Sequence, residues 1–264
     1  MPLWRLVSRP LGFYQRHAAS LVFRRPLVID GPEALVSFTF DDFPRSALFA
    51  GGAILNRFHI SGTYYASLGL VGQEGPTGRI FVPTELRELL RQGHELGCHT
   101  FSHCHSWDTP TPVFERSIME NRRALAELAP GAEFRSLAYP ISLPRPRTKA
   151  RVAEYFPCSR GGGQTFNTGT TDLNQLSAFF LEKSRDRFQN VADVIDRNAE
   201  ARGWLILATH DVSADPTPFG CTPGFFGEVV RYAIGSGARI LPVAEALEVL
   251  TSRAAALGRT GISE

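Results

Sequence analysis

The sequence predicts an α/β fold in one domain, built on a parallel β-sheet that curls into a barrel. Strand-like and helix-like segments alternate in about seven β–α units, and no linker separates them. The 264 residues suffice for one large core, as in α/β barrels. Polar residues follow several of the predicted strands, and the carboxyl ends of barrel strands share one face. A barrel is therefore favoured over an open sheet.

The first half of the chain alternates strands and helices. The expected elements are a strand over 34–40, a helix over 46–58, a strand over 63–70, a helix over 84–91 and a strand over 95–98. The first of these is rich in Val, Phe and Thr, which favour strands. Thr84 offers an N-cap, and Gly93 ends that helix.

The second half continues the pattern. The expected strands cover 134–139, 178–181, 204–209 and 238–242, and the expected helices cover 112–128, 147–156, 191–202, 223–234 and 244–257. Pro112 suits the first turn of a helix, and Pro130-Gly131 ends it. Gly203 ends the helix over 191–202.

The composition is typical of a soluble globular protein. Apolar residues make up 43% of the chain, and the mean hydropathy is -0.09. A net charge of +2 is too small to indicate nucleic-acid binding, and zinc-finger spacing, heptads and repeats are absent from the sequence. No apolar run approaches the roughly 18–20 residues that a membrane span needs.

The N-terminal segment is basic and aromatic. Residues 1–29 contain five arginines and no Asp or Glu, among several aromatic and aliphatic side chains. We predict an N-terminal arm over 1–30, followed by a catalytic barrel over 31–264. Residues 1–25 of the arm could pack on the barrel or on another subunit, lie on an anionic membrane, or serve as a targeting peptide.

The four cysteines are expected to be reduced. They are Cys98, Cys104, Cys158 and Cys221. Because the segment over 1–29 lacks the compact apolar core and cleavage site of a secretory signal, a disulfide framework is not expected. We therefore predict a cytoplasmic protein, with membrane association as an alternative.

Two adjacent carboxylates and a histidine pair have the residue types of a metal-assisted hydrolase. Asp41 and Asp42 end the strand over 34–40, and their neighbouring side chains should diverge. One can then bind a metal while the other acts as a general base on a water molecule. His99 and His103 are four residues apart, so on a helical turn both imidazoles would point to one side. Two histidines and one carboxylate suit Zn²⁺, and also Fe²⁺, Co²⁺ or Ni²⁺.

A third histidine follows another predicted strand. His210 ends the run over 204–209, and a histidine can protonate a leaving group near neutral pH. Simpler explanations exist for each group. Asp41 and Asp42 could cap a helix, and His210 could be a buried histidine bonded to the backbone. Asp211 could serve only to orient a loop.

The sequence resembles the polysaccharide deacetylase family, carbohydrate esterase family four, in three motifs that occur in the family's order. They are Thr39-Phe40-Asp41-Asp42, His99-Thr100-Phe101-Ser102-His103 and Leu207-Ala208-Thr209-His210. The run Gly93-His94-Glu95-Leu96-Gly97-Cys98 also matches the approach to the histidine motif. The resemblance covers residues 35–250.

This resemblance implies a distorted (β/α)₇ barrel of TIM-like form and a metal-dependent hydrolase. The reaction that it implies is removal of an N- or O-acyl group, usually acetyl from an amino sugar. Carried onto this chain, it makes Asp41 the base and His210 the acid. It makes Asp42, His99 and His103 the metal ligands.

A further family motif, expected near Tyr139, departs from the family pattern in this sequence. The family often carries Arg-x-Pro-Tyr, in which the arginine braces the base and a backbone N–H helps to hold the oxyanion. If Pro140 is matched to that proline, Ala138 takes the arginine position and Ile141 supplies the N–H. Arg135 and Arg160 are then rival braces. Arg160 precedes three glycines, which predict a flexible turn, and it could equally form a loop salt bridge.

Other residues near the motifs are candidates for substrate contacts. We predict that Tyr139 and Trp107 bind substrate, although Trp107 could equally pack in the protein. The proline-rich loop over 215–223 could form a wall of the cleft. Cys98 and Cys104 are not predicted to be ligands, since Cys98 should point away from His99 at a strand end.

The leading functional prediction is a metal-dependent deacetylase of an amino sugar in an oligosaccharide, polysaccharide or glycan precursor. Its divalent metal would be Zn²⁺, with Co²⁺ or Ni²⁺ as alternatives. A second prediction is a hydrolase of non-sugar amides, such as ureides or formamides, on the same fold. A non-catalytic glycan-binding barrel is the third.

Overall fold

The core of the protein is one curled, mostly parallel β-sheet. The computed structural model describes residues 18–141, 143–185 and 187–260. The strands follow the order β10-β11-β2-β3-β6-β7-β8, with β12 beside β2. Their bounds are β2 Leu35–Phe40, β3 Thr63–Ala66, β6 Glu95–Cys98, β7 Leu137–Ala138, β8 Ser159–Arg160, β10 Phe179–Phe180, β11 Trp204–Thr209 and β12 Arg239–Ile240. Among the described residues no ladder joins β8 to β10, so the sheet is a half-barrel. The predicted fold class is confirmed in this form.

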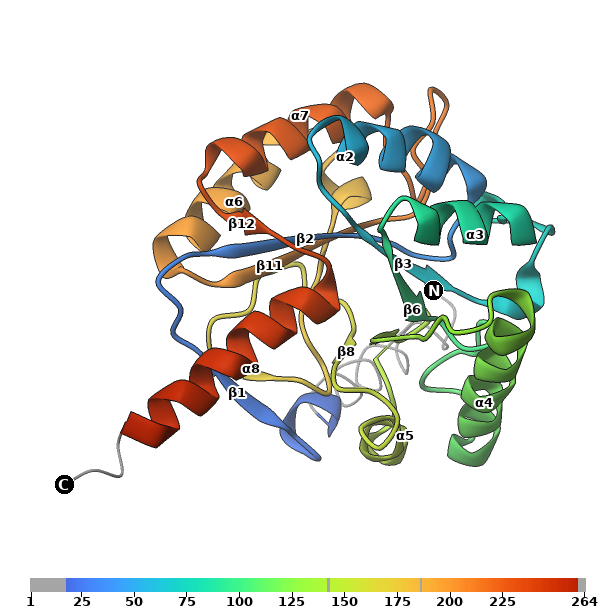
Figure 1. The fold of residues 1–264 in the computed structure, drawn as a ribbon, viewed down its shortest axis with the longest axis horizontal. Coiled ribbons are helices and arrows are strands. Elements are labelled where there is room, and N and C mark those ends of the chain that lie inside the picture. Colours follow the sequence, from blue (N-terminus) through green and yellow to red (C-terminus); the bar gives the residue numbers. More distant parts are fainter. Residues whose placement is uncertain (1–17, 142, 186, 261–264) are drawn as a thin grey trace, which may run out of the picture.

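Helices surround the outside of this sheet (Figure 1). The α-helices are α2 Ala53–Arg57, α3 Pro83–Arg91, α4 Thr111–Leu128, α5 Pro146–Val152, α6 Phe188–Ala201, α7 Pro223–Gly235 and α8 Val243–Thr260. A π-helix, η1 (Ala47–Gly52), precedes α2, and short 3₁₀ helices cover η2 (Leu68–Leu70) and η3 (Leu181–Ser184). The predicted helix over 46–58 therefore begins as a π-helix.

Strands β2 and β11 form the centre of the sheet and are buried along their whole length. Strands covered on both faces are rich in apolar residues, and these two are apolar except at Ser37, Thr39 and Thr209. Phe38 and Phe40 of β2 pack against Phe226 of α7, with ring centroids 5.7 and 5.5 Å apart. The parallel register pairs Phe40 with Thr209. Asp41 and His210, the residues that follow this pair, therefore lie at the same end of the sheet.

Several short strands were not predicted. Strands β4 (Glu74–Gly75) and β5 (Gly78–Arg79) form a small antiparallel hairpin, and β8 is only two residues long. The predicted strand over 134–139 is reduced to β7, and the predicted helix over 147–156 ends earlier, at Val152. Two-residue strands show no alternation that a sequence pattern could reveal.

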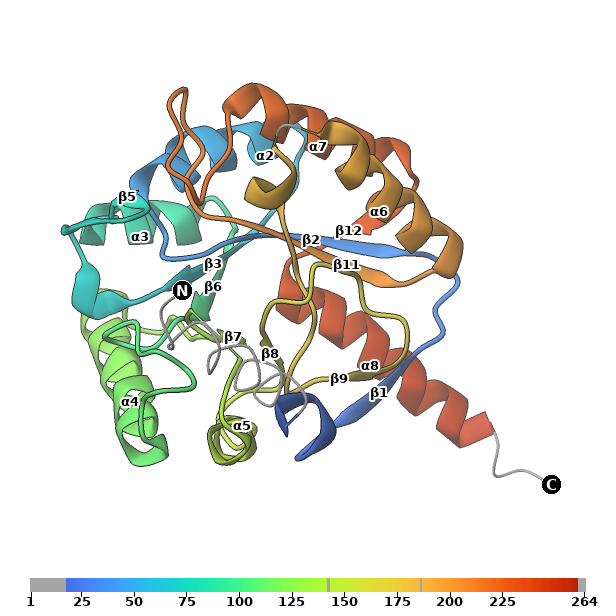
Figure 2. The same cartoon turned by 180° about the vertical axis from the view of Figure 1, so that it is seen from behind.

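The end of the predicted N-terminal arm is built into the fold. Strand β1 (Pro26–Ile29) pairs antiparallel with β9 (Gly169–Asp172), and Figure 2 shows them side by side. Asp172 accepts from the Arg25 main-chain N–H at 3.0 Å and pairs with the buried Lys149 at 2.5 Å. Lys149 also donates to the Ala19 carbonyl at 2.6 Å.

The other predictions for the arm lie mostly outside the described residues. Residues 1–17 are not described, so the boundary at 30 and the membrane or subunit contact through 1–25 stay predictions. Of the described part of that segment, Leu21, Val22 and Phe23 are exposed. In the part of the chain that the structure covers, no helix is long and apolar enough to cross a bilayer.

Candidate active site

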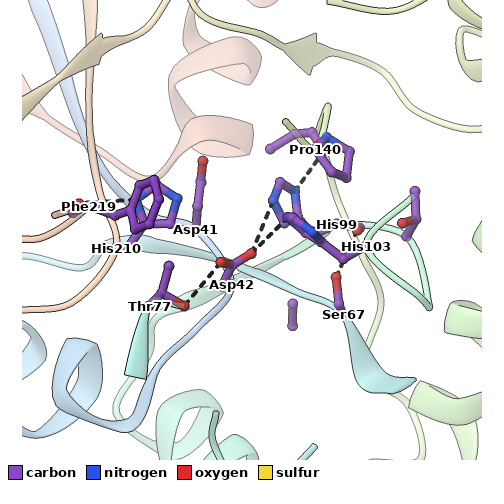
Figure 3. A network of polar contacts seen from close by, with 12 residues as sticks. Asp41, Asp42, Ser67, Thr77, His99, His103, Pro140, His210 and Phe219 are labelled. Carbon is purple, nitrogen blue, oxygen red and sulfur yellow. Dashed lines mark hydrogen bonds and ion pairs between the residues drawn. The ribbon is translucent and has the colours of Figure 1, made fainter. Parts of the chain in front are cut away.

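The two carboxylates after β2 point in different directions. The Asp41 main-chain N–H donates to the Thr209 carbonyl at 2.9 Å, which keeps Asp41 in line with β11. Asp42 has φ of 61°, in the left-handed region that few side chains adopt. The chain therefore turns sharply between the two residues. Figure 3 shows Asp42 directed at His99 and His103, while Asp41 lies on the side of His210.

Asp42, His99 and His103 form a group with the composition of a divalent-metal site. One ligand atom from each lies within 4.8 Å of the others. Asp42 Oδ1 is 3.5 Å from His99 Nε2 and 3.1 Å from His103 Nε2. Asp42 and His99 are buried, and His103 is partly exposed. The group thus opens to solvent on the His103 side.

The protonation of His99 supports a cation at this position. His99 Nδ1 is 2.8 Å from the Ala138 carbonyl, which can only accept, so Nδ1 carries the proton. Its Nε2 then presents a lone pair toward Asp42 Oδ1, a buried oxygen that has no hydrogen-bond partner. Two acceptors facing each other in a buried site are costly unless a cation lies between them. The residues present therefore fit a bound divalent metal.

Burial and charge also set the ionisation of these ligands. Burial lowers the pKa of His99 to about 4, so the imidazole is neutral at neutral pH, as a ligand must be. Burial alone would raise the pKa of Asp42, but His103 and His99 outweigh it and hold that pKa well below its usual range. Asp42 is therefore a carboxylate at neutral pH.

The histidine motif lies on a loop. Residues 99–103 do not form the predicted helical turn, and Thr100 and His103 have φ of 60° and 50°. The loop is held at its start, where Ser67 Oγ donates to the His99 carbonyl at 2.8 Å. The prediction of a helical turn was wrong because two left-handed residues bring His103 back toward Asp42.

The structure separates the two candidate arginine braces. Arg160 lies in β8 rather than in a flexible turn, is 1% exposed, and bonds Asp41 Oδ1 through its guanidinium. Its guanidinium carbon is 4.6 Å from the ring centroid of Tyr65. Arg135 instead pairs with Glu248 of α8 and does not reach Asp41. The contact to Asp41 therefore belongs to Arg160.

His210 is oriented by the loop that follows β11. Its Nδ1 is 3.2 Å from the Phe219 carbonyl, so Nδ1 carries the proton and Nε2 is left for other chemistry (Figure 3). Asp211 holds this loop, accepting from Thr217 N at 2.9 Å and from Thr217 Oγ1 at 2.5 Å. Asp211 thus has the loop-orienting role that the sequence left open.

The remaining predicted site residues, Tyr139, Ile141 and Trp107, differ in their exposure and contacts. Tyr139 is buried, and its hydroxyl donates to the Asn174 carbonyl at 3.2 Å, so the structure does not bring this hydroxyl to the metal group. Ile141 is 65% exposed and has φ of 67°. Trp107 is partly buried, and its carbonyl accepts from Arg145.

Of the two cysteines near the histidine motif, Cys98 is buried and accepts from Asn121 at 3.3 Å, away from the metal group. Burial raises the pKa of the Cys98 thiol to about 11, so it stays protonated. Cys104 Sγ lies 3.2 Å from Ser102 Oγ. The expectation that Cys98 points away from the ligands agrees with this arrangement.

Two residues near the site were missed by the sequence analysis. Thr77, on the β4–β5 hairpin, donates to Asp42 Oδ2 at 3.1 Å. Glu182 follows β10, and burial raises the pKa of its carboxyl group, which also interacts electrostatically with His210 and Asp41. A polar residue after a strand could have indicated Glu182, whereas no local pattern links Thr77 to Asp42.

Comparison with known proteins gives one family and one fold. The family model for polysaccharide deacetylase matches residues 29–156. No curated protein matches the sequence.

Solved structures share the fold at low sequence identity. Peptidoglycan deacetylase PdaC from Bacillus subtilis is 16% identical, with a TM-score of 0.58, over 89% of this chain and 100% of that one. A family 4 acetyl xylan esterase from Clostridium thermocellum in complex with a cobalt ion is 20% identical, with a TM-score of 0.56, over 81% and 91%. A mutant of a pseudoenzyme of carbohydrate esterase family 4, with restored enzymatic activity, is 10% identical, with a TM-score of 0.56, over 82% of this chain and 68% of that one. Residues 29–156 therefore match the polysaccharide deacetylase family, and solved structures of carbohydrate esterase family 4 share the fold of the chain.

Proposed function

We propose that this protein is a metal-dependent hydrolase that removes an acetyl group from an amino sugar in an oligosaccharide, polysaccharide or glycan precursor. The observation that carries the proposal is the arrangement of two adjacent carboxylates with separate partners. Asp42 faces two histidine Nε2 atoms, and Asp41 is bonded to the buried Arg160. One carboxylate is thereby committed to a cation and the other is left for proton transfer.

Asp42, His99 and His103 would hold the metal. A divalent ion there would polarise the acyl carbonyl and lower the pKa of a water molecule, so that attack proceeds near neutral pH. We propose Zn²⁺, with Co²⁺ or Ni²⁺ as alternatives, because two imidazoles and a carboxylate suit all three ions. A structure with the same fold contains a cobalt ion, which supports Co²⁺ as one of these ions.

The protein's own residues would move the protons. Asp41 accepts a proton from the attacking water, and the guanidinium of Arg160 holds its carboxylate in place. In its imidazolium form, with a proton on each ring nitrogen, His210 would donate the Nε2 proton to the leaving nitrogen, while the Phe219 carbonyl holds the ring through Nδ1–H. The Ile141 main-chain N–H would donate to the oxygen on which negative charge develops. Its left-handed conformation turns the backbone sharply at that point.

The substrate proposal rests on the family and is tested by a panel. The metal-loaded full chain would be assayed for acetate release from N-acetylglucosamine oligomers and acetylated xylan, and for hydrolysis of small formamides and ureides. Release from the amino-sugar oligomers supports the proposal, and hydrolysis of the small amides alone would replace it with the second prediction. No hydrolysis of any of these compounds would favour a non-catalytic glycan-binding barrel.

The role of Asp41 is tested by Asp41→Asn, which removes the base and leaves the three ligands in place. General-base catalysis contributes about 10²–10⁴-fold, so acetate release should fall by that factor. Bound metal should stay at the wild-type level. Retained turnover in Asp41→Asn would refute the assignment.

A further inference from the structure

Thr77 makes a contact that separates the two oxygens of Asp42. Its hydroxyl lies 3.1 Å from Asp42 Oδ2, while Oδ1 faces His99 and His103. Because an ionised carboxylate can only accept, Thr77 must be the donor. We propose that Thr77 is a positioning residue that engages Oδ2 and leaves Oδ1 as the oxygen that binds the metal. This inference rests on the proposed metal-dependent function.

The burial of both groups makes this contact important for the position of the Asp42 carboxylate. Thr77 is 3% exposed and Asp42 is 8% exposed, so water cannot easily replace the hydroxyl. A hydrogen bond to a buried charged group is stronger than one between neutral groups, and the loss of its donor leaves an unsatisfied oxygen. Without Thr77, the Asp42 carboxylate could rotate or turn both oxygens toward the histidines.

The hairpin that carries Thr77 is fastened to the residues after Asp42. Phe81 N donates to the Phe43 carbonyl at 3.2 Å, and the two aromatic rings stack with centroids 4.3 Å apart. Ile80 forms an isolated bridge with Pro44. The turn itself requires Gly78, whose φ is 99°. The hydroxyl is therefore held at a fixed place relative to the carboxylate that it contacts.

Groups that hydrogen-bond to metal ligands without touching the metal affect metal affinity, and the geometry of Thr77 is of this kind. Hydrogen bonds to a ligating carboxylate orient it, and their removal lowers metal affinity by about 10–100-fold. Thr77 is the group that would do this for Asp42, as the Ala138 carbonyl does for His99. Both ligands would thus be oriented through the atom that does not face the metal.

The test compares metal affinity among four full-length proteins. Thr77→Val keeps the shape and removes the hydroxyl, Thr77→Ser keeps the hydroxyl, and Thr170→Val makes the same change at an exposed position of β9. Zn²⁺ and Co²⁺ dissociation constants would be measured by competition with a chromophoric chelator, and the visible spectrum of bound Co²⁺ would report the ligand arrangement. Melting of the metal-free proteins would be recorded beside them.

We expect Thr77→Val to bind each metal about 10–100-fold more weakly and to alter the Co²⁺ spectrum. Thr77→Ser and Thr170→Val should stay close to the wild type. Where valine impairs folding, Thr77→Ala, which is smaller than threonine, gives the same comparison. Wild-type affinity and spectrum in a folded Thr77→Val or Thr77→Ala protein would overturn the inference. A wild-type chain that binds neither metal would instead contradict the proposed function itself.

Discussion

The ion pair between Arg160 and Asp41 leads to the most demanding prediction. Arg160 is 1% exposed and Asp41 is 4% exposed, so the pair lies out of reach of bulk water. Replacing the arginine by Arg160→Met leaves a buried carboxylate without its counter-charge. Breaking a buried pair in this way costs about 3–5 kcal/mol. That is a large part of the roughly 5–15 kcal/mol by which a typical domain is stable.

The same substitution should also reduce catalysis. Without the guanidinium, the Asp41 carboxylate loses the hydrogen-bonded partner that holds it in place. Acetate release should then fall toward the limit of about 10²–10⁴-fold that a general base contributes. Bound metal should not change, because Asp42, His99 and His103 keep their contacts. Urea unfolding of the metal-free proteins gives the stability, and acetate release with metal analysis gives the catalytic effect.

Arg135→Met is the matched control. Arg135 and Glu248 are 43% and 63% exposed at their side chains, and exposed pairs contribute about 0–1 kcal/mol. A second control combines Arg160→Met with Asp41→Asn, which removes both charges and should recover part of the lost stability. An Arg160→Met protein that is as stable and active as the wild type would refute the role of this ion pair. A larger loss in Arg135→Met than in Arg160→Met would refute it as well.

Two further predictions concern the loop after His210 and a buried glutamate. A Cβ at Gly220 would overlap the carboxylate and carbonyl oxygens of Asp211, whereas one at Gly224 meets open space. Gly220→Ala should therefore shift the loop that orients His210 and lower acetate release, with metal content unchanged. Gly224→Ala is the control and should leave acetate release at the wild-type level. Equal acetate release by the two variants would refute the role of this loop. Burial raises the pKa of Glu95 from 4.5 to about 7, so the folded state binds its proton more tightly than the unfolded state. As the pH rises from 4.5 to 7, the wild type should therefore lose unfolding free energy relative to Glu95→Gln. At 1.36 kcal/mol per pKa unit the loss is up to about 3 kcal/mol. A difference between the two proteins that does not change with pH would contradict this prediction.

Much of the site could be predicted because its residues follow strands. Parallel strands deliver the residues after their carboxyl ends to one edge, so Asp41, His99 and His210 were expected to meet. The register of β2 and β11 brings this about for two of them, since Phe40 pairs with Thr209. The fold class followed from the same alternation of strands and helices.

Contacts between distant short segments could not be predicted. Arg160 reaches Asp41 across 119 residues, from a strand of two residues that shows no periodicity. The three glycines after Arg160 predict a flexible turn, so the sequence does not indicate strand β8 there. Thr77 reaches Asp42 from a hairpin whose turn residues predict a bend but not its partner. Such pairings depend on how the sheet curls, which local patterns do not encode.

Hydrolysis by this protein should depend on a metal held by Asp42, His99 and His103. The most direct measurement adds Zn²⁺ stepwise to metal-free protein and follows bound metal and acetate release from an N-acetylglucosamine oligomer in the same samples. Both should rise together and level off at one equivalent, and His99→Gln should bind less metal and release less acetate at every step. Full acetate release without metal, or one bound equivalent with no release, would contradict the claim.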